Sequence, residues 1–441
     1  MTTGAVTPRL FKLAWPLVAG NLLQTVYNLA DMFWVGRVNA EAVAAVSLMF
    51  PTAYLFVSVA MGLTAGANAV VSQHIGAGNE REAQNAVAQS VLLALVVPFT
   101  FLFFVFRASL RAAGDTRTAM WLVAASAGLN IVIDPVFILD WGPFLGLGAQ
   151  GAAIATFISR GFAAAAGLYI LVDGGWGICL RVGDLRPDWP VLRRLVDVGY
   201  PATFDGLTRS LAAVTFAALV ARFGAVATAA YGIGIRLMSV SWTVSGAVGQ
   251  AAATGVGQNL GARKPERAAE VTYKGTGGAM AVLFAAGGLA WAFPAAAMRV
   301  FIADPEVVDA GVVFLRIIAP FWAFMGGLMV VQGGLRGAGQ TRVAFLLSLL
   351  SRWVFRIPVA LLLAYDLALN PVSVTGLWWS LPVSSVVAFV VGVAWFRRGG
   401  WQEAIVEDAT DGASPPGAGD PDATPGEAAD PADASEDPAT D

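Results

Sequence analysis

Long apolar runs separated by short polar segments fill the chain from about residue 10 to residue 396. A helix needs roughly 20 apolar residues to cross about 30 Å of hydrocarbon. Eleven runs suit such a crossing, and they cover 10–36, 42–72, 84–107, 118–138, 149–172, 199–221, 225–258, 268–295, 308–334, 343–368 and 372–396. A backbone inside lipid must satisfy its own hydrogen bonds. We therefore expect these runs to be helices and the fold to be that of an all-α membrane protein.

Two copies of one membrane unit follow each other along the chain. In the first part of each copy, matching positions differ by a constant number of residues. In the later part that difference is again constant but larger. The matched stretches are Pro16 with Pro201, VSQHIGAG (71–78) with VGQNLGAR (256–263), and LRAAGDTR (110–117) with LRGAGQTR (335–342). A duplicated helical unit is the usual plan of a secondary transporter. The sequence therefore predicts two homologous helical-bundle lobes.

The repeat and the polar segments divide the chain into four parts. We expect an N-terminal transmembrane lobe over 1–172, a cytoplasmic inter-lobe linker over 173–198, a C-terminal transmembrane lobe over 199–398 and an acidic tail over 399–441. Residues 403–441 hold twelve Asp or Glu and no Lys or Arg. They also have few apolar side chains to bury, so we expect the tail to be disordered.

The difference between the two offsets indicates that about 40 residues are missing from the N-terminal lobe. The stretch between Gln258 and Leu335 is long enough for two crossings, whereas the stretch between Gln73 and Leu110 is long enough for only one. We therefore expect about 11 transmembrane segments where a complete pair of lobes would have 12. With one crossing lost, LRAAGDTR would lie on the opposite side from QHIGAG.

The distribution of positive charges argues against placing LRAAGDTR and QHIGAG on opposite sides of the membrane. If each lobe had six crossings and the N-terminus lay inside, the inner segments would carry seventeen Lys or Arg and the outer segments three. Such a bias is typical of cytoplasmic loops. It favours a twelve-crossing plan in the plasma membrane with both termini in the cytoplasm. The sequence leaves open whether the segment around Pro98 is a hairpin, a single span or a broken helix.

Composition excludes several classes of protein. Hydrophobic residues make up 57% of the chain and charged residues 13%, too little polar surface for a soluble enzyme or a nucleic-acid binder. The single Cys179 excludes an intramolecular disulfide, and one histidine argues against most metal and histidine-base mechanisms. The glycine-rich GAGN and GARK segments lack the spacing of a phosphate loop. We expect neither an enzyme nor a cofactor.

Two acids lie deep inside predicted crossings, Asp31 and Asp134. An ionised carboxylate at mid-bilayer costs at least ~2.5 kcal/mol, so it persists mostly where it is used or paired. Tyr27 precedes Asp31 by four residues, and Asn130 precedes Asp134 by four, so each pair shares a helix face. These oxygens suit a proton or a hard cation such as Na⁺. The alternative is that either Asp caps a helix or pairs near its end.

Other charged residues inside the crossings are interpreted as structural. Asp205 and Arg209 are four residues apart and form a predicted salt pair, with contact to a substrate as the alternative. Arg352 and Arg356 share a helix face and are expected to brace the inner surface.

Five separated stretches resemble the multidrug and toxic compound extrusion (MATE) family, archaeal-like branch. They are WPLVAGNLLQTVYNLADMFWVGRV, SQHIGAGNEREA, LRAAGDTRTAM, LNIVIDPVFI and GLGAQGAAIATFIS. The resemblance implies a twelve-helix, two-lobed cation antiporter in which the acids at Asp31 and Asp134 couple to H⁺ or Na⁺. It further implies that Thr156 contributes to the same site and that the first helix bends at Pro16. The segment missing from the N-terminal lobe departs from the family pattern.

The function expected from the sequence is secondary active efflux of multiple drugs or organic cations. Entry of H⁺ or Na⁺ would drive it, by alternating access between the two lobes. We expect a monomer that takes a small amphipathic or cationic substrate and has no nucleic-acid partner. Phe33, Trp34 and Met61 are candidates to line the substrate cleft.

Two alternatives remain open. One is a lipid-linked oligosaccharide flippase of the same superfamily, whose cavity would be basic. This alternative remains open because the chain has Arg209, Arg236 and Arg356 within its predicted crossings. The other is a non-functional, truncated family member, because the missing segment removes part of one lobe.

Overall fold

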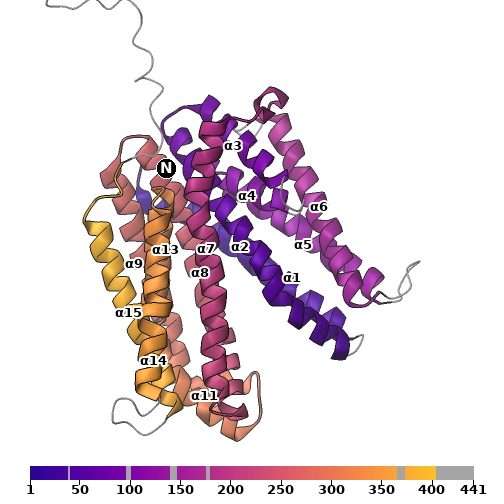
Figure 1. Cartoon of the computed structure of the whole chain (residues 1–441), viewed down its shortest axis with the longest axis vertical. Coiled ribbons are helices and arrows are strands. Elements are labelled where there is room, and N and C mark those ends of the chain that lie inside the picture. The colour runs from indigo at the N-terminus through magenta and orange to yellow at the C-terminus, as the bar shows by residue number, and fades with distance from the viewer. Residues whose placement is uncertain (38–39, 96–100, 140–146, 175–178, 365–372, 404–441) are drawn as a thin grey trace, which may run out of the picture. The chain divides into compact units, whose positions relative to one another are not determined.

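Helices form all regular secondary structure in the part of the chain that the structure describes (Figure 1). The computed structural model describes residues 1–37, 40–95, 101–139, 147–174, 179–364 and 373–403. Within these ranges, the side chains of residues 29, 31–33, 36, 40–56, 101, 149, 182 and 240 lie outside the description. Nearly all of the predicted acidic tail lies outside it as well.

The helices follow the predicted apolar runs. The first half contains α1 (Val6–Gly36), α2 (Ala40–Gly76), α3 (Glu80–Leu95), α4 (Phe101–Ala113), α5 (Thr116–Ile138) and α6 (Ala149–Asp173). A 3₁₀ turn, η1 (Val182–Leu185), follows. The second half contains α7 (Trp189–Ala221), α8 (Ala225–Gly261), α9 (Pro265–Ala292), α10 (Pro294–Arg299), α11 (Pro305–Ile318), η2 (Ala319–Phe321), α12 (Trp322–Gly337), α13 (Thr341–Leu349), η3 (Leu350–Arg356), α14 (Ile357–Ala364) and α15 (Val374–Arg397).

Seven helical segments among the described residues are long and apolar enough to cross a membrane. They are Thr116–Ile138, Gln150–Asp173, Trp189–Ala221, Pro265–Ala292, Pro305–Gly337, Thr341–Ala364 and Val374–Arg397. The prediction of an all-α, multi-pass membrane protein is confirmed.

Several helices start at acidic caps that satisfy the first free backbone amides. The Asp115 carboxylate accepts a hydrogen bond from the Thr118 amide at 2.9 Å, which fixes the start of α5. Asp188 accepts from the Val191 amide at 3.3 Å, and Pro190 occupies the first turn of α7. As a result, α7 begins inside the range expected for the inter-lobe linker.

The range 84–107, expected as one crossing, contains two short helices. Helix α3 has 16 residues and α4 has 13, so they are about 24 Å and about 20 Å long at about 1.5 Å per residue. Neither spans about 30 Å of hydrocarbon. Figure 1 shows both helices in the upper part of the first half, whereas α1 and α6 run on to its lower end.

The ends of α3 and α4 show that the two helices form a hairpin. The turn before α3 packs against the end of α8, because a Cβ on Gly76 would overlap the carbonyl oxygen of Gln258. The end of α4 reaches the same place, where the Gln258 amide donates to the Ala112 carbonyl at 2.8 Å. The chain therefore leaves and returns on one side. LRAAGDTR and QHIGAG therefore lie together, as the charge distribution predicts. A single crossing between them would have placed them on opposite sides.

Reciprocal contacts relate the two halves by pseudo-symmetry. Gln73 on α2 donates to the Gly337 carbonyl at the end of α12, at 3.1 Å, just as Gln258 on α8 donates to Ala112. These positions correspond to one another in the sequence repeat. A Cβ on Gly261 would overlap the carbonyl of Gln73, the counterpart of the Gly76 contact. The backbones at the ends of α2 and α8 are therefore in direct contact, and this contact joins the two halves.

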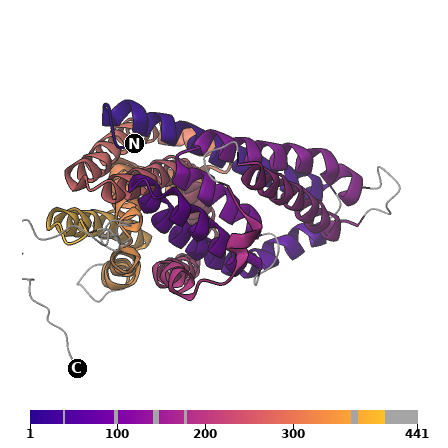
Figure 2. The same ribbon diagram turned by 90° about the horizontal axis from the view of Figure 1, so that it is seen from above.

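Helix α1 packs against both halves. Its first turns bury Val6, Leu10, Leu13, Ala14 and Leu17 in an apolar cluster with α8, α9, α12 and α15. Its later part packs on α5 and reaches α6. Figure 2 shows this indigo helix running from the salmon helices of the second half toward the purple helices of the first. The change between the two packings falls just after Pro16.

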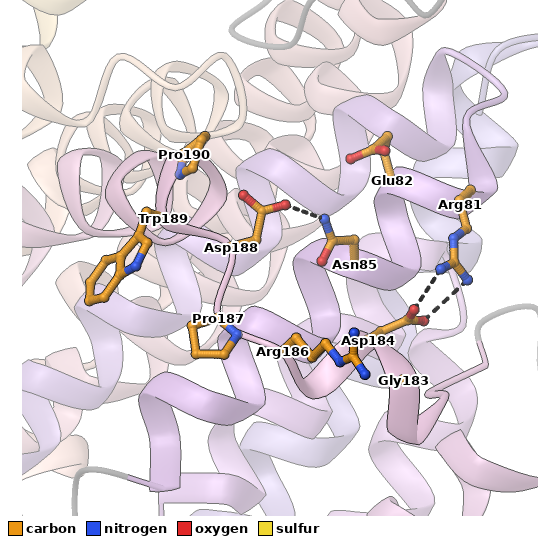
Figure 3. A pocket seen from close by; sticks show the side chains of 10 residues that line it. All are labelled: Arg81, Glu82, Asn85, Gly183, Asp184, Arg186, Pro187, Asp188, Trp189 and Pro190. Atoms are coloured by element: carbon orange, nitrogen blue, oxygen red, sulfur yellow. Dashed lines mark hydrogen bonds and ion pairs between the residues drawn. The ribbon is translucent and has the colours of Figure 1, made fainter.

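The segment between the halves lies on α3, where Arg81 and Asn85 bind its Asp184 and Asp188 (Figure 3). A buried amide also holds it there. Gln89, fully buried, donates to the Asp184 carbonyl at 3.2 Å and to the Arg186 carbonyl at 2.8 Å, and accepts from the Asp188 amide at 3.1 Å. Arg81 pairs with Asp184 at 2.7 Å. An open depression of about 560 Å³ lies beside these groups. Several of its polar side chains already bind one another, so we assign no substrate to it.

We expect Gln89→Leu to lower the free energy of unfolding by about 3 kcal/mol, because it leaves buried backbone groups of the linker without partners. Thermal unfolding of the detergent-solubilised protein, followed by tryptophan fluorescence, measures the change. Gln84→Leu on the same helix is the control, because no hydrogen bond of its side chain is found in the described part of the chain. Equal losses in both variants would contradict a specific clamp at Gln89.

Candidate functional site

A cavity of about 300 Å³ lies between the two halves. Residues of α1, α2, α4, α7, α8 and α12 line it. On α2 its wall ends near Asn68, about one turn before Gln73, which donates to the Gly337 carbonyl of α12. The reciprocal glutamine and glycine contacts therefore close the cavity toward the side of the α3–α4 hairpin ends. We call this space the central cavity.

The central cavity is electrically positive. Five charged residues line it, namely Arg107, Arg111, Arg209, Arg336 and Asp205. Four positive charges against one negative charge leave an excess of three positive charges. Apolar side chains such as Met61, Phe104 and Met329 fill much of the remaining wall. The space therefore combines an apolar surface with unbalanced positive charge.

Asp205 is the hub of an ion-pair network on one wall. Its Oδ2 atom lies 3.0 Å from Arg209 Nη2 and 2.7 Å from Arg336 Nη2, and its Oδ1 atom lies 3.7 Å from Arg352 Nη1. The predicted Asp205–Arg209 salt pair is confirmed. Asp205 is only 3% exposed, so the pairing offsets the cost of its burial.

Arg352, predicted to brace the inner surface, contacts another helix. Its Nη1 atom lies 3.7 Å from Asp205 Oδ1 on α7. Arg352 lies in η3, a π-helical segment between α13 and α14, and such a segment rotates the side chains that follow relative to a regular α-helix. Arg356, in the same segment, donates to Ser384 on α15 at 3.3 Å. Both arginines therefore bind side chains of other helices, which periodicity alone does not identify.

The opposite wall carries Arg107 and Arg111 on α4. Arg111 Nη1 donates to Gln250 Oε1 of α8 at 2.5 Å. Arg107 packs beside the ring of Phe103, with its guanidinium carbon 5.3 Å from the ring centroid. Arg111 belongs to the LRAAGDTR stretch of the sequence repeat, whereas sequence analysis did not single out Arg107. The signal was present, since Arg107 interrupts the apolar run before LRAAGDTR.

The predicted ion-coupling residues occur in two hydrogen-bonded pairs inside the first half. Asn130 Nδ2 donates to Asp134 Oδ1 at 3.1 Å on α5, and both residues are almost fully buried. The Tyr27 hydroxyl of α1 lies 3.1 Å from the Thr156 hydroxyl of α6. Helices α1, α5 and α6 pack on one another. The side chain of Asp31 lies outside the described residues.

The surroundings of Tyr27 contain a basic group that sequence analysis did not expect. A small pocket beside Tyr27 is lined in part by Ser126, Ser159 and Arg160. The Arg160 guanidinium carbon lies 5.8 Å from the Phe104 ring centroid. Arg160 therefore lines the same small pocket as Tyr27. No group of three or more His, Cys, Asp or Glu suited to a metal occurs among the described residues.

The predicted lining residues have different outcomes. Met61 lines the central cavity, as predicted. Trp34 instead packs beside the cluster of Val35, Ile138 and Ala152 near the ends of α1 and α5. The side chain of Phe33 lies outside the described residues.

Comparison with known proteins agrees with the fold. The probable multidrug resistance protein NorM of Thermotoga maritima is 26% identical over 441 residues, covering 91% of this chain and 94% of that protein. The FAD transporter of Shewanella oneidensis is 28% identical over 302 residues, covering 59% of this chain and 66% of that protein.

A solved structure shares the architecture. A MOP superfamily transporter from Pyrococcus furiosus, described by the reverse polarity of its binding pocket, superposes with a TM-score of 0.82 at 22% identity, covering 90% of this chain and 96% of that one. At that identity the likeness shows the fold alone. The model of the MatE family matches residues 16–98 and 201–362, parts of both repeats and more than half of the sequence. The chain therefore belongs to the MatE family of membrane transporters.

Proposed function

We propose that the protein is a secondary active exporter of the plasma membrane that couples entry of H⁺ or Na⁺ to outward movement of an amphipathic organic molecule. The observation that carries this proposal is the fully buried Asp134, hydrogen-bonded to Asn130 within a membrane-crossing helix. A carboxylate there persists mostly where it binds an ion, a proton or a partner. The names of the relatives, multidrug resistance proteins among them, agree with export.

In the proposed cycle the central cavity opens alternately to each side. The reciprocal contacts of Gln73 and Gln258 close one side and would separate in the other state. The change of packing along α1 supports a hinge at Pro16, because one end of α1 follows the second half and the other end follows α5 and α6. Movement at this hinge would link the site at Tyr27 and Thr156 to the closure of the cavity.

The basic central cavity favours a second candidate, the lipid-linked oligosaccharide flippase. A pyrophosphate headgroup would suit Arg107 and Arg111. Such a flippase would move a lipid, whereas the proposed exporter moves a soluble dye only when an ion gradient is present.

The decisive experiment reconstitutes the purified protein in vesicles loaded with rhodamine 123 or carboxyfluorescein. A proton gradient and a sodium gradient are then imposed separately. We expect one gradient to drive export of at least one dye and the other to have little effect, which also identifies the coupling ion. Export of neither dye under either gradient would overturn the proposal and favour a non-functional, truncated family member.

A further inference from the structure

We propose that the central cavity binds amphipathic organic anions, and that Arg107 and Arg111 of α4 hold the anionic group. The inference rests on the proposed function, because it names the charge class of the molecule that the exporter moves. It replaces the organic cation that the acids Asp31 and Asp134 led us to expect from the sequence. Asp134 lies in the interior of the first half and not among the residues that line the central cavity.

Arg107 and Arg111 form no ion pair with any carboxylate among the described residues. The Nε atom of Arg107 is buried and makes no hydrogen bond there. Its charged neighbours are Arg111 and Arg160, both of the same sign. Arg111 has the neutral amide of Gln250 as its hydrogen-bond acceptor. This wall of the cavity therefore carries uncompensated positive charge.

Uncompensated charge within the membrane is costly. A buried guanidinium needs a counter-charge to offset its lost hydration. An anion in the central cavity would provide that counter-charge. A cation would add to the repulsion between Arg107 and Arg111.

The spacing of Arg107 and Arg111 on α4 allows both guanidiniums to bind one ligand. Arg107 and Arg111 are four residues apart on α4, so their side chains leave the same helix face one turn apart. Forked guanidiniums match the paired oxygens of a carboxylate, a sulfonate or a phosphate. The apolar wall that includes Met61 and Met329 would receive the rest of the molecule.

The internal repeat shows that the positive wall belongs to one half. The offset that relates LRAAGDTR to LRGAGQTR also relates Arg107 to Gln332 and Arg111 to Arg336, and all four residues line the cavity. In the second half the equivalent of Arg107 is neutral, and Arg336 is paired with Asp205 at 2.7 Å. Among the four arginines that line the cavity, Arg107 and Arg111 are the two with no carboxylate within ion-pair distance in the described part of the chain, which locates the anion at α4.

The test uses two dyes that share a xanthene ring and differ in charge, carboxyfluorescein (anionic) and rhodamine 123 (cationic). The full chain in detergent is titrated with each dye, and fluorescence anisotropy gives the dissociation constant. We expect the wild type to bind carboxyfluorescein about tenfold more tightly than rhodamine 123. The Arg107→Gln/Arg111→Gln variant should lose about tenfold in carboxyfluorescein affinity and none in rhodamine affinity.

Matched variants distinguish a loss of affinity caused by lost charge from one caused by altered folding. Gln332 shows that glutamine fits this environment in the other half, and Arg193→Gln makes the same change at a side chain that is 86% exposed. Arg107→Lys/Arg111→Lys keeps both charges and should keep most of the affinity, whereas a purely structural brace between α4 and α8 would be disturbed by lysine as well. Displacement of the dye by phosphatidic acid but not by a soluble naphthalene sulfonate would assign the anion to a lipid headgroup, and the reverse result to a free solute.

Tighter binding of rhodamine 123 by the wild type, or unchanged carboxyfluorescein binding by the glutamine double variant, would overturn the inference. Gradient-driven export of rhodamine 123 alongside either result would leave the proposed exporter standing and remove only the anion assignment. If neither dye is exported but carboxyfluorescein binds through α4, the anion site holds and the exporter fails.

Discussion

Asp134→Asn should reduce ion-driven dye export from reconstituted vesicles by about two orders of magnitude, to the rate of passive leak. The substitution keeps the size of the side chain and an oxygen that accepts from Asn130 Nδ2. It removes the negative charge, without which the site neither exchanges a proton nor holds Na⁺. Loss of about 3 kcal/mol of ion-binding free energy corresponds to roughly a hundredfold. We expect the same result for Asp31→Asn.

The control for this prediction makes the same change at an exposed acid, Asp309→Asn on α11. That variant should export dye at the wild-type rate. Carboxyfluorescein binding in detergent, measured for both variants, reports on the fold of the central cavity. Wild-type export by Asp134→Asn under both gradients would show that the coupling ion is bound elsewhere.

Gly261→Val should hold the protein with the contact between α2 and α8 broken. A Cβ at this position overlaps the backbone carbonyl of Gln73, and a backbone atom cannot rotate away as a side chain can. Overpacking of this kind costs about 3 kcal/mol, which shifts a two-state equilibrium by roughly a hundredfold. Export should fall accordingly, because one state of the cycle becomes rare.

Spin labels at Glu80→Cys and Glu266→Cys, both exposed, measure the separation of the two helix turns in a Cys179→Ser background. We expect a longer inter-label distance in Gly261→Val than in the parent protein. Gly278→Val on α9 is the matched control, because an added Cβ there meets no atom within 4 Å. An unchanged distance together with unchanged export would show that the closure is not part of the transport cycle.

Much of the fold was predictable because its signals are local. Apolar runs of sufficient length specify helices in lipid whatever their neighbours are. The repeat was also visible, and its offsets correctly related Gln73 to Gln258. The salt pair of Asp205 with Arg209 was predictable too, since both residues lie on one helix face.

The α3–α4 hairpin and the charge of the central cavity were not predictable from local pattern. A count of apolar residues gives the same total for one crossing as for two half-length helices. The choice depended on both ends of the pair meeting α8, through contacts between residues far apart in sequence. Charge placement was the better guide because it records the side of the membrane and not the length of a helix.

The sequence by itself determined that this is a duplicated, all-helical membrane protein with a buried acid in its first half. Those features depend on composition, periodicity and repetition, which neighbouring residues already carry. Apart from the local pair of Arg209 with Asp205, only the tertiary structure decided which arginines meet a carboxylate. Arg336 and Arg352 reach Asp205 from other helices, whereas Arg107 and Arg111 meet only each other, Arg160 and neutral groups among the described residues. The physical reason is that the electrostatic balance of a buried charge depends on its neighbours in space, which no local pattern specifies.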